Sequence, residues 1–179
     1  MSEDGGLVES IRITHVLECI ADPSKIRVVA EISCDIAEAL PYLATLLPQA
    51  GYNHAATIMT LMREGRLITV YPRMVTLAKA LDEDDARDVL EWLRGRINEA
   101  YARRGELVPC LERRRSPRLL DVYRLLPRDN CRRCGEATCM ALAARLVSGD
   151  ARLQDCTRLT EASFARNREL IAEWLGVED

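Results

Sequence analysis

Stretches rich in isoleucine, valine and other apolar residues alternate with short segments that contain glycine, proline or aspartate. Short apolar runs bounded by turn residues are typical of β-strands. The first two runs predict a hairpin that turns around Asp22 and Pro23. Arg63, Glu64 and Gly65 are expected to turn a second strand pair. The predicted strands cover residues 12–19, 25–33, 56–62, 66–71 and 74–80.

Helical periodicity is clearest over residues 82–104, where apolar side chains recur three or four positions apart. This stretch begins with four acidic residues, which is ordinary for a first turn, and Gly105 is expected to cap its end. A shorter helix is expected over residues 35–47, with Asp35 as its N-cap and with a later start or a kink at Pro41. Further helices are predicted over residues 117–126, 139–147 and 160–175.

These elements predict an α+β protein in which an N-terminal antiparallel sheet with helices precedes a small, mostly helical module. Residues 1–109 are expected to form the α+β domain, and residues 119–179 the helical module. The charged stretch at residues 110–118, which contains Arg113, Arg114 and Arg115, is the expected linker.

The composition argues against several classes of protein. Hydrophobic residues make up 48% of the chain, enough for a real core, and the net charge of −3 argues against a general nucleic-acid binder. No apolar run approaches the length that spans a bilayer, and the acidic N-terminus does not resemble a secretory signal. We therefore expect a cytoplasmic protein with neither a membrane nor a nucleic-acid partner, in which clustered cysteines bind metal rather than form disulfides.

Four of the seven cysteines form the strongest motif. Cys131, Cys134 and Cys139 lie within nine residues, and Cys156 follows after a gap of 16 residues. One tight loop with three thiols and a remote fourth is the pattern expected for a [4Fe–4S] cluster. Gly135 provides a position for positive φ beside the ligands, and Cys139 opens a predicted helix whose N-terminus favours an anionic cofactor.

Structural zinc is the main competing metal for four thiolates, although zinc sites usually use two short Cys-x-x-Cys pairs. The spacing also differs from the C-x₃-C-x₂-C motif of radical enzymes that bind S-adenosylmethionine. Arg128, Arg132 and Arg133 flank the ligands and predict either a docking surface for an acidic partner or ordinary solvated side chains.

This stretch resembles the four-cysteine [4Fe–4S] module of the large subunit of the corrinoid iron–sulfur protein, the acetyl-CoA decarbonylase/synthase gamma subunit. A similar module occurs in the B subunit of Rnf electron-transport complexes. The shared residues, from about residue 119 to 159, are Leu125, Leu126, Pro127, Asn130, Cys131, Cys134, Gly135, Thr138, Cys139, Met140, Ala141, Ala143, Leu146, Gly149 and Cys156.

The resemblance implies a low-potential cluster that passes single electrons, with the four cysteines as ligands and with Asn130, Thr138 and Gly135 beside the cofactor. In the corrinoid protein the cluster serves the reductive activation of cobalt. Only about twenty residues follow Cys156, so cobalt would lie on a partner. The first 109 residues resemble the upstream part of small stand-alone iron–sulfur proteins of anaerobic bacteria and archaea.

Other candidate residues are weaker. Cys19 and Cys34 are expected to be buried hydrophobic residues, His15 is expected in the core, and Cys110 is a candidate exposed thiol. The segment 52–54, which ends in His54, is the only loop of the first domain that we consider a candidate functional site.

Together these patterns predict an accessory protein that transfers one electron to or from a partner metalloenzyme or corrinoid protein and is not itself an enzyme. A metal-stapled interaction module, with zinc or a redox-sensing cluster, is the alternative. Catalysis by the cluster as a Lewis acid would need an iron without a protein ligand, which four cysteines do not leave.

Overall fold

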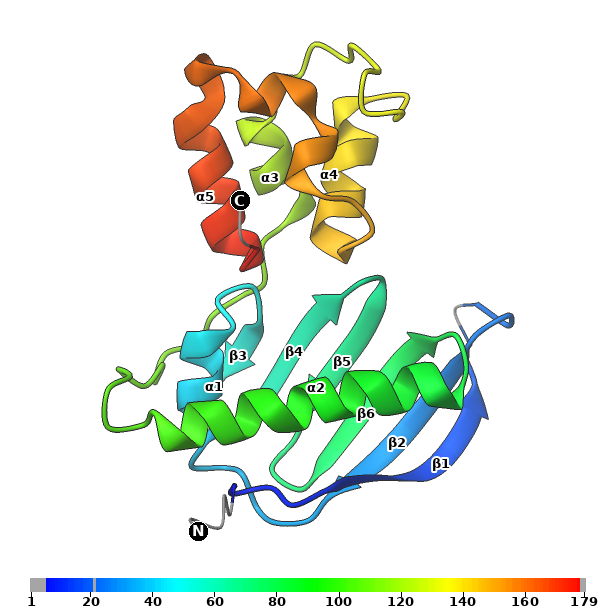
Figure 1. Ribbon diagram of the computed structural model, residues 1–179, viewed down its shortest axis with the longest axis vertical. Helices are drawn as coiled ribbons and strands as arrows, with labels where there is room; N and C mark the ends of the chain where they lie inside the picture. Colours follow the sequence, from blue (N-terminus) through cyan, green and yellow to red (C-terminus); the bar gives the residue numbers. More distant parts are fainter. Residues whose placement is uncertain (1–5, 21, 178–179) are drawn as a thin grey trace, which may run out of the picture. The chain divides into compact units, whose positions relative to one another are not determined.

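The computed structural model describes residues 6–20 and 22–177. Its contacts divide the chain into two units, which Figure 1 shows in the colours of the sequence. The first unit extends to Leu61 and continues over Arg66–Arg115, and the second comprises Met62–Gly65 and the chain from Ser116 onward. The α+β class predicted from the sequence is confirmed, with an antiparallel sheet in the first unit and a helical second unit.

The sheet has the strand order β1-β2-β6-β5-β4-β3. Its register aligns Val28 of β2 with Leu77 of β6 and Leu77 with Ile68 of β5, so one fully buried row crosses three strands. Side chains alternate between the two faces of a strand, which places such rows on one face. The strands are β1 (Ile11–Glu18), β2 (Ile26–Ile32), β3 (Gly51–Asn53), β4 (Ile58–Arg63), β5 (Arg66–Val70) and β6 (Met74–Ala80).

Helices α1 (Leu40–Leu46) and α2 (Glu83–Ala102) complete the first unit, and α2 runs across the sheet in Figure 1. Both helices contribute buried residues to the same core as the inward rows of the sheet. The buried face of α2 repeats every three or four residues, as its sequence predicts. Its members are Ala86, Val89, Leu90, Leu93, Ile97 and Ala100.

An ion pair joins the start of α2 to the sheet. Asp85 accepts hydrogen bonds from the Arg66 guanidinium, with Nε at 2.8 Å, and from the backbone N–H of Leu81 at 2.8 Å. The two charged side chains are only 16% and 13% exposed. The hydrogen bond from Arg66 is the main reason that the pKa of Asp85 lies below its usual value.

Replacing Asp85 with asparagine is expected to lower the free energy of unfolding by about 2 kcal/mol at neutral pH, because charge-assisted hydrogen bonds are lost. Since the pKa of Asp85 is lowered in the folded state, this stability is present above the unfolded pKa of about 3.9 and disappears as pH falls through the folded value. Urea unfolding of both proteins at neutral pH and at about pH 3 checks this. Asp84→Asn, at a 91% exposed side chain, is the control with little effect. A difference between wild type and Asp85→Asn that is independent of pH would contradict the ion-pair explanation.

The second unit contains α3 (Leu119–Leu125), α4 (Cys139–Ser148) and α5 (Ala165–Leu175), with short 3₁₀ helices between α4 and α5. Their apolar faces form a separate core. Two of the four motif cysteines, Cys139 and Cys156, are members of that core. The predicted metal ligands are therefore part of the packing of this unit. The 3₁₀ helices are η1 (Leu153–Asp155), η2 (Thr157–Thr160) and η3 (Ala162–Phe164).

Several predicted boundaries were wrong for identifiable reasons. Helix α1 begins at Leu40 rather than at Asp35, since Pro41 is tolerated only in a first turn, and Asp35 instead accepts the N–H of Ala37 at 2.9 Å. Helix α2 ends at a cap formed by Arg103, not Gly105. Two 3₁₀ turns occupy the expected start of the last helix, so α5 begins five residues later than predicted.

Part of the stretch predicted as a linker packs within the first unit. The backbone N–H of Cys110 donates to the carbonyl of Pro41 at 3.1 Å, and Arg114 exchanges backbone hydrogen bonds with Tyr52 at 2.8 and 2.7 Å. Unit 1 accordingly runs to Arg115. Among the described residues, no helix is long and apolar enough to cross a membrane.

Candidate metal centre

The four motif cysteines come from three parts of the second unit. Cys131 and Cys134 lie in the loop at residues 127–138, Cys139 is the first residue of α4, and Cys156 lies between η1 and η2. Cys139 and Cys156 are only 6% and 5% exposed, Cys134 is half-buried, and Cys131 is exposed. All four are free thiols. The loop and the core therefore contribute ligands of very different accessibility.

The loop has an unusual backbone. Arg128, Asn130 and Arg132 have φ of 61°, 50° and 60°, and Gly135 has φ of 85°, so the positive φ predicted for Gly135 is confirmed. A left-handed conformation costs a non-glycine residue about 1–2 kcal/mol and persists only where the surroundings impose it. Anion-binding nests also use left-handed residues, in alternation with right-handed ones. This backbone suits a loop that wraps an anionic cofactor.

Asn130 and Thr138 both act on the first turn of α4. The Asn130 side-chain oxygen Oδ1 accepts the N–H of Cys139 at 2.8 Å, and Thr138 Oγ1 accepts the N–H of Ala141 at 3.1 Å. These bonds satisfy two of the first N–H groups of the helix, which have no partner within it. In this structure the two residues position Cys139, and direct contact with a cofactor stays a prediction.

Burial and two other thiols act on the Cys156 thiol. Burial raises the pKa of the Cys156 thiol, and negative charge at Cys134 and Cys139 raises it further. Hydrogen bonds from the backbones of Leu159 and Arg158 act in the opposite direction. A buried thiol of this kind keeps its proton unless a cation takes its place. The arrangement is thus suited to bind a positively charged metal core.

Among the described residues, no three histidine, cysteine, aspartate or glutamate side chains converge on one metal position. The chemistry of the donors still fits an iron–sulfur cluster, because cysteine thiolates are its usual protein ligands. Cys134, Cys139 and Cys156 all pack in or against the second core, whereas Cys131 does not. Binding of a cluster by all four thiols therefore requires the segments that carry them to bring the four sulfurs closer together.

Two ion pairs neutralise the carboxylates of the loop. Asp129 pairs with Arg158 at 2.5 Å, and Glu136 pairs with Arg145 of α4. These partners lie 29 and 9 residues apart, and sequence reasoning did not find either pair. No local signal identifies them, because several other arginines lie equally near in sequence.

The pairing leaves the loop with a net positive surface. Arg128, Arg132 and Arg133 are exposed, and within the described parts of the chain no ion pair to them is seen. The two loop carboxylates that could neutralise them are held by Arg145 and Arg158. The predicted docking residues thus form an unneutralised cationic surface beside Cys131, which we call the arginine edge.

The other candidate residues lie in the first unit. His15 is exposed on β1 rather than in the core, and Cys19 is buried as predicted. The segment expected to be a functional loop is partly strand β3, where Tyr52 is 1% exposed and contacts His54 Nδ1 through its hydroxyl at 3.1 Å. Cys110 is half-buried, and its thiol donates weakly to the carbonyl of Glu112 at 3.6 Å.

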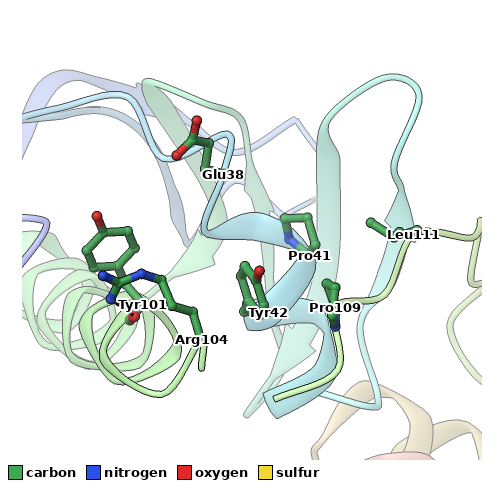
Figure 2. A pocket seen from close by; sticks show the side chains of 7 residues that line it. All are labelled: Glu38, Pro41, Tyr42, Tyr101, Arg104, Pro109 and Leu111. Atoms are coloured by element: carbon green, nitrogen blue, oxygen red, sulfur yellow. Dashed lines mark hydrogen bonds between the residues drawn. The ribbon is translucent and has the colours of Figure 1, made fainter. Parts of the chain in front are cut away.

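A shallow groove also lies in the first unit, and Figure 2 shows its side chains. The Arg104 guanidinium stacks on the Tyr101 ring at 4.1 Å and donates to the Tyr101 carbonyl at 2.6 Å. None of the lining residues is a thiol or an imidazole, so the groove offers no further set of soft metal ligands. It is lined by Glu38, Pro41, Tyr42, Tyr101, Arg104, Pro109 and Leu111.

Comparison with known proteins decides the class of the cysteine module. Residues 126–158 match the family model FeS, described as "Putative Fe-S cluster". The C-terminal region is homologous to an iron–sulfur cluster domain. No solved structure matches the chain.

Three relatives illustrate this similarity. The gamma subunit of the acetyl-CoA decarbonylase/synthase complex of Methanopyrus kandleri is 45% identical over 53 residues, which are 30% of this chain and 12% of that protein. The corresponding subunit of Methanocaldococcus jannaschii is 35% identical over 69 residues, 34% of this chain and 14% of that protein. The corrinoid/iron–sulfur protein large subunit of Moorella thermoacetica is 43% identical over 44 residues, 25% of this chain and 10% of that protein.

The resemblance to the corrinoid iron–sulfur subunits is therefore confirmed for the C-terminal region. The match covers no more than 14% of the length of these relatives, so it concerns this module alone. The resemblance to the Rnf subunit and that of the first 109 residues stay predictions.

Proposed function

We propose that this chain is an electron-transfer protein whose second unit holds a [4Fe–4S] cluster through Cys131, Cys134, Cys139 and Cys156. The observation that carries the proposal is the coincidence of this ligand set with the segment that matches an iron–sulfur family. When bound, the cluster supplies a site that gains and loses one electron. The residues of the chain hold the cluster and control the access of water to it.

The residues around the cysteines favour the anionic cofactor in three ways. The loop backbone bends through left-handed residues, and Cys139 opens a helix of 10 residues whose dipole places partial positive charge at this end. Asn130 and Thr138 fix that first turn. The core around Cys139 and Cys156 limits the access of water to their sulfurs. These features support one-electron exchange without a catalytic step, so we propose a carrier or accessory subunit rather than an enzyme.

The partner that we propose is a corrinoid protein or another metalloenzyme. The printed names of the relatives describe a subunit of a decarbonylase/synthase complex and a corrinoid/iron–sulfur protein. In this proposal the partner carries the metal centre that uses the electron. We also propose a reducing compartment, the cytoplasm, because seven free cysteines suit it.

We infer that the partner docks at the arginine edge. Arg128, Arg132 and Arg133 lie next to Cys131 in the sequence and are exposed. An electron crosses most readily where the cluster is closest to the surface, and Cys131 is the exposed ligand. A partner with an acidic surface would be steered to this edge by long-range attraction.

The proposal predicts that the reduced protein gives up one electron per chain and that its rate depends on the charge of the oxidant. At low salt, the double variant Arg132→Glu/Arg133→Glu should react roughly tenfold more slowly than wild type with ferricyanide, an anion. It should react faster with hexaammineruthenium(III), a cation. Stopped-flow absorbance measures both rates, and high salt should remove most of the difference.

The control variant is Arg113→Glu/Arg115→Glu, which changes the net charge equally at exposed residues of the first unit. Its rates should stay close to those of wild type. Equal effects of the two double variants would show that the rates depend only on net charge and would refute the proposed docking surface. A wild-type protein that yields no electron would remove the proposed function itself.

A further inference from the structure

Strand β1 lies at one edge of the sheet in the first unit (Figure 1). The strand at the opposite edge, β3, has a neighbour, because Tyr52 and Arg114 exchange backbone hydrogen bonds at 2.7 and 2.8 Å. Among the described residues, β1 pairs with β2 and with no strand on its other side. A row of unpaired backbone N–H and C=O groups is a template for another strand. The free edge of β1 is therefore a candidate interaction surface.

The residues on this free edge can be assigned from the hydrogen bonds on the paired side. Just after β1, the N–H of Cys19 donates to the carbonyl of Lys25 at 3.0 Å. Just before β1, the carbonyl of Ser10 accepts the N–H of Ser33 at 3.0 Å. Backbone groups of successive residues in an antiparallel strand point alternately toward and away from one neighbour. The residues whose backbone groups point away from β2 are therefore Ile11, Ile13, Val16 and Glu18.

These four residues are unevenly spaced, because a bulge shifts the register of β1 between Ile13 and His15. Val16 follows Ile13 by three positions, whereas the outward groups of a regular strand recur every two. A regular strand can therefore match only one half of the free edge. A second copy of β1, running in the opposite direction, has the same irregular spacing and matches both halves.

We propose that β1 pairs antiparallel with β1 of a second copy of this chain, around a two-fold axis between Thr14 and His15. In this register the backbone groups of Ile13 lie opposite those of Val16 in the other copy. Each such pair occurs twice, as the symmetry of a two-fold dimer requires. The two sheets become one continuous sheet, and both free β1 edges are paired. The inference concerns the first unit and is independent of the proposed cluster.

The side chains at this edge agree with the proposed register. Val16 is paired with Val28 and Ile13 with Ala30, and both of these β2 residues are fully buried in the core. Directly paired residues point to the same face of a sheet, so Val16 and Ile13 lie on the core side. Val16 is nevertheless 42% exposed, because the sheet ends at β1. In the dimer, Ile13 of the second copy lies beside Val16 and extends the core across the axis.

Sedimentation equilibrium and hydrogen exchange of the full chain, purified without oxygen, test this dimer. We expect a dimer that dissociates on dilution. We also expect amide exchange in β1 to slow as the protein concentration rises, because the N–H groups on the free edge become hydrogen-bonded. A monomer at every concentration up to about 1 mM would overturn the proposal. So would a dimer in which β1 exchanges as fast as it does in the monomer.

Two lysine variants locate the interface. Val16→Lys should raise the dissociation constant of the dimer roughly hundredfold, because each lysine would be buried against an isoleucine of the other copy. Lysine is common on exposed edge strands, so the monomer should still fold, which circular dichroism checks. The control is Leu67→Lys, at a residue of similar exposure, 39%, on the interior strand β5, and it should leave the dimer unchanged. Equal effects of the two variants, or no effect of Val16→Lys, would contradict the proposed interface.

Discussion

Replacing Cys156 with serine is expected to remove the iron–sulfur cluster, with iron falling from about four atoms to less than about one per chain. Cys156 is 5% exposed and lies in the core between Leu153 and Leu159, so no other thiol can take its place. The serine hydroxyl would be a poorer ligand and a buried polar group. Metal analysis and the visible absorption spectrum of protein purified without oxygen measure the effect.

The matched control is Cys110→Ser, because Cys110 lies in the first unit and belongs to no cluster of thiols. It should keep the full iron content. The Cys156 variant should also unfold at lower denaturant concentration than wild type, since the free energy of metal binding contributes to folding. An unchanged iron content and spectrum in Cys156→Ser would refute its assignment as a ligand.

The second large effect is expected in the first unit, where Arg114→Ala should lower the free energy of unfolding by about 3 kcal/mol. The Arg114 guanidinium donates to the carbonyls of Leu47 at 2.9 Å, Ala50 at 3.2 Å and Ala44. These carbonyls lie in and just after helix α1, where the last turn of a helix leaves carbonyl groups without partners. Alanine would remove the guanidinium donors from all three carbonyls, of which that of Leu47 would keep the N–H of Ala50 at 3.0 Å.

Burial lowers the pKa of Arg114, but a guanidinium keeps its charge in proteins, so the effect should not depend on pH near neutrality. Urea unfolding can be followed by the fluorescence of Trp92, which packs against the first core, in a Trp174→Phe background. Arg113→Ala, at an exposed neighbouring residue, should change stability by less than about 0.5 kcal/mol. Equal losses for Arg113→Ala and Arg114→Ala would contradict the capping role.

The sequence predicted much of the first unit because its signals are local. Strand β6 has the bounds expected from its apolar run. Helix α2 begins at Glu83, one residue after the predicted start, and Asp82 is its N-cap, accepting the N–H of Asp85 at 2.8 Å. Strand β3 was missed, because Gly51 and Asn53 are turn residues and its pairing with β4 is a tertiary interaction. Of the two effects predicted for Pro41, a later start of the helix or a kink, the structure shows the later start.

At the candidate metal centre, too, the local features were predictable from the sequence and the tertiary ones were not. The spacing of the four cysteines was enough to predict them as metal ligands. The glycine at position 135 was enough to predict the positive φ that the structure shows there. The burial of Cys156 and the exposure of Cys131 depend on packing between segments far apart in the chain. So does the pair between Asp129 and Arg158, 29 residues apart, which sets the charge of the loop. No local pattern contains that information.

The proposed electron transfer depends on a redox-active [4Fe–4S] cluster held by residues 119–179. The most direct measurement is the iron and acid-labile sulfide content of the wild-type chain purified without oxygen, together with its EPR spectrum before and after dithionite. We expect about four irons and four sulfides per chain and an EPR signal that appears on reduction by one electron. Stoichiometric zinc, with no sulfide and no visible absorption, would contradict it and leave a metal-stapled interaction module.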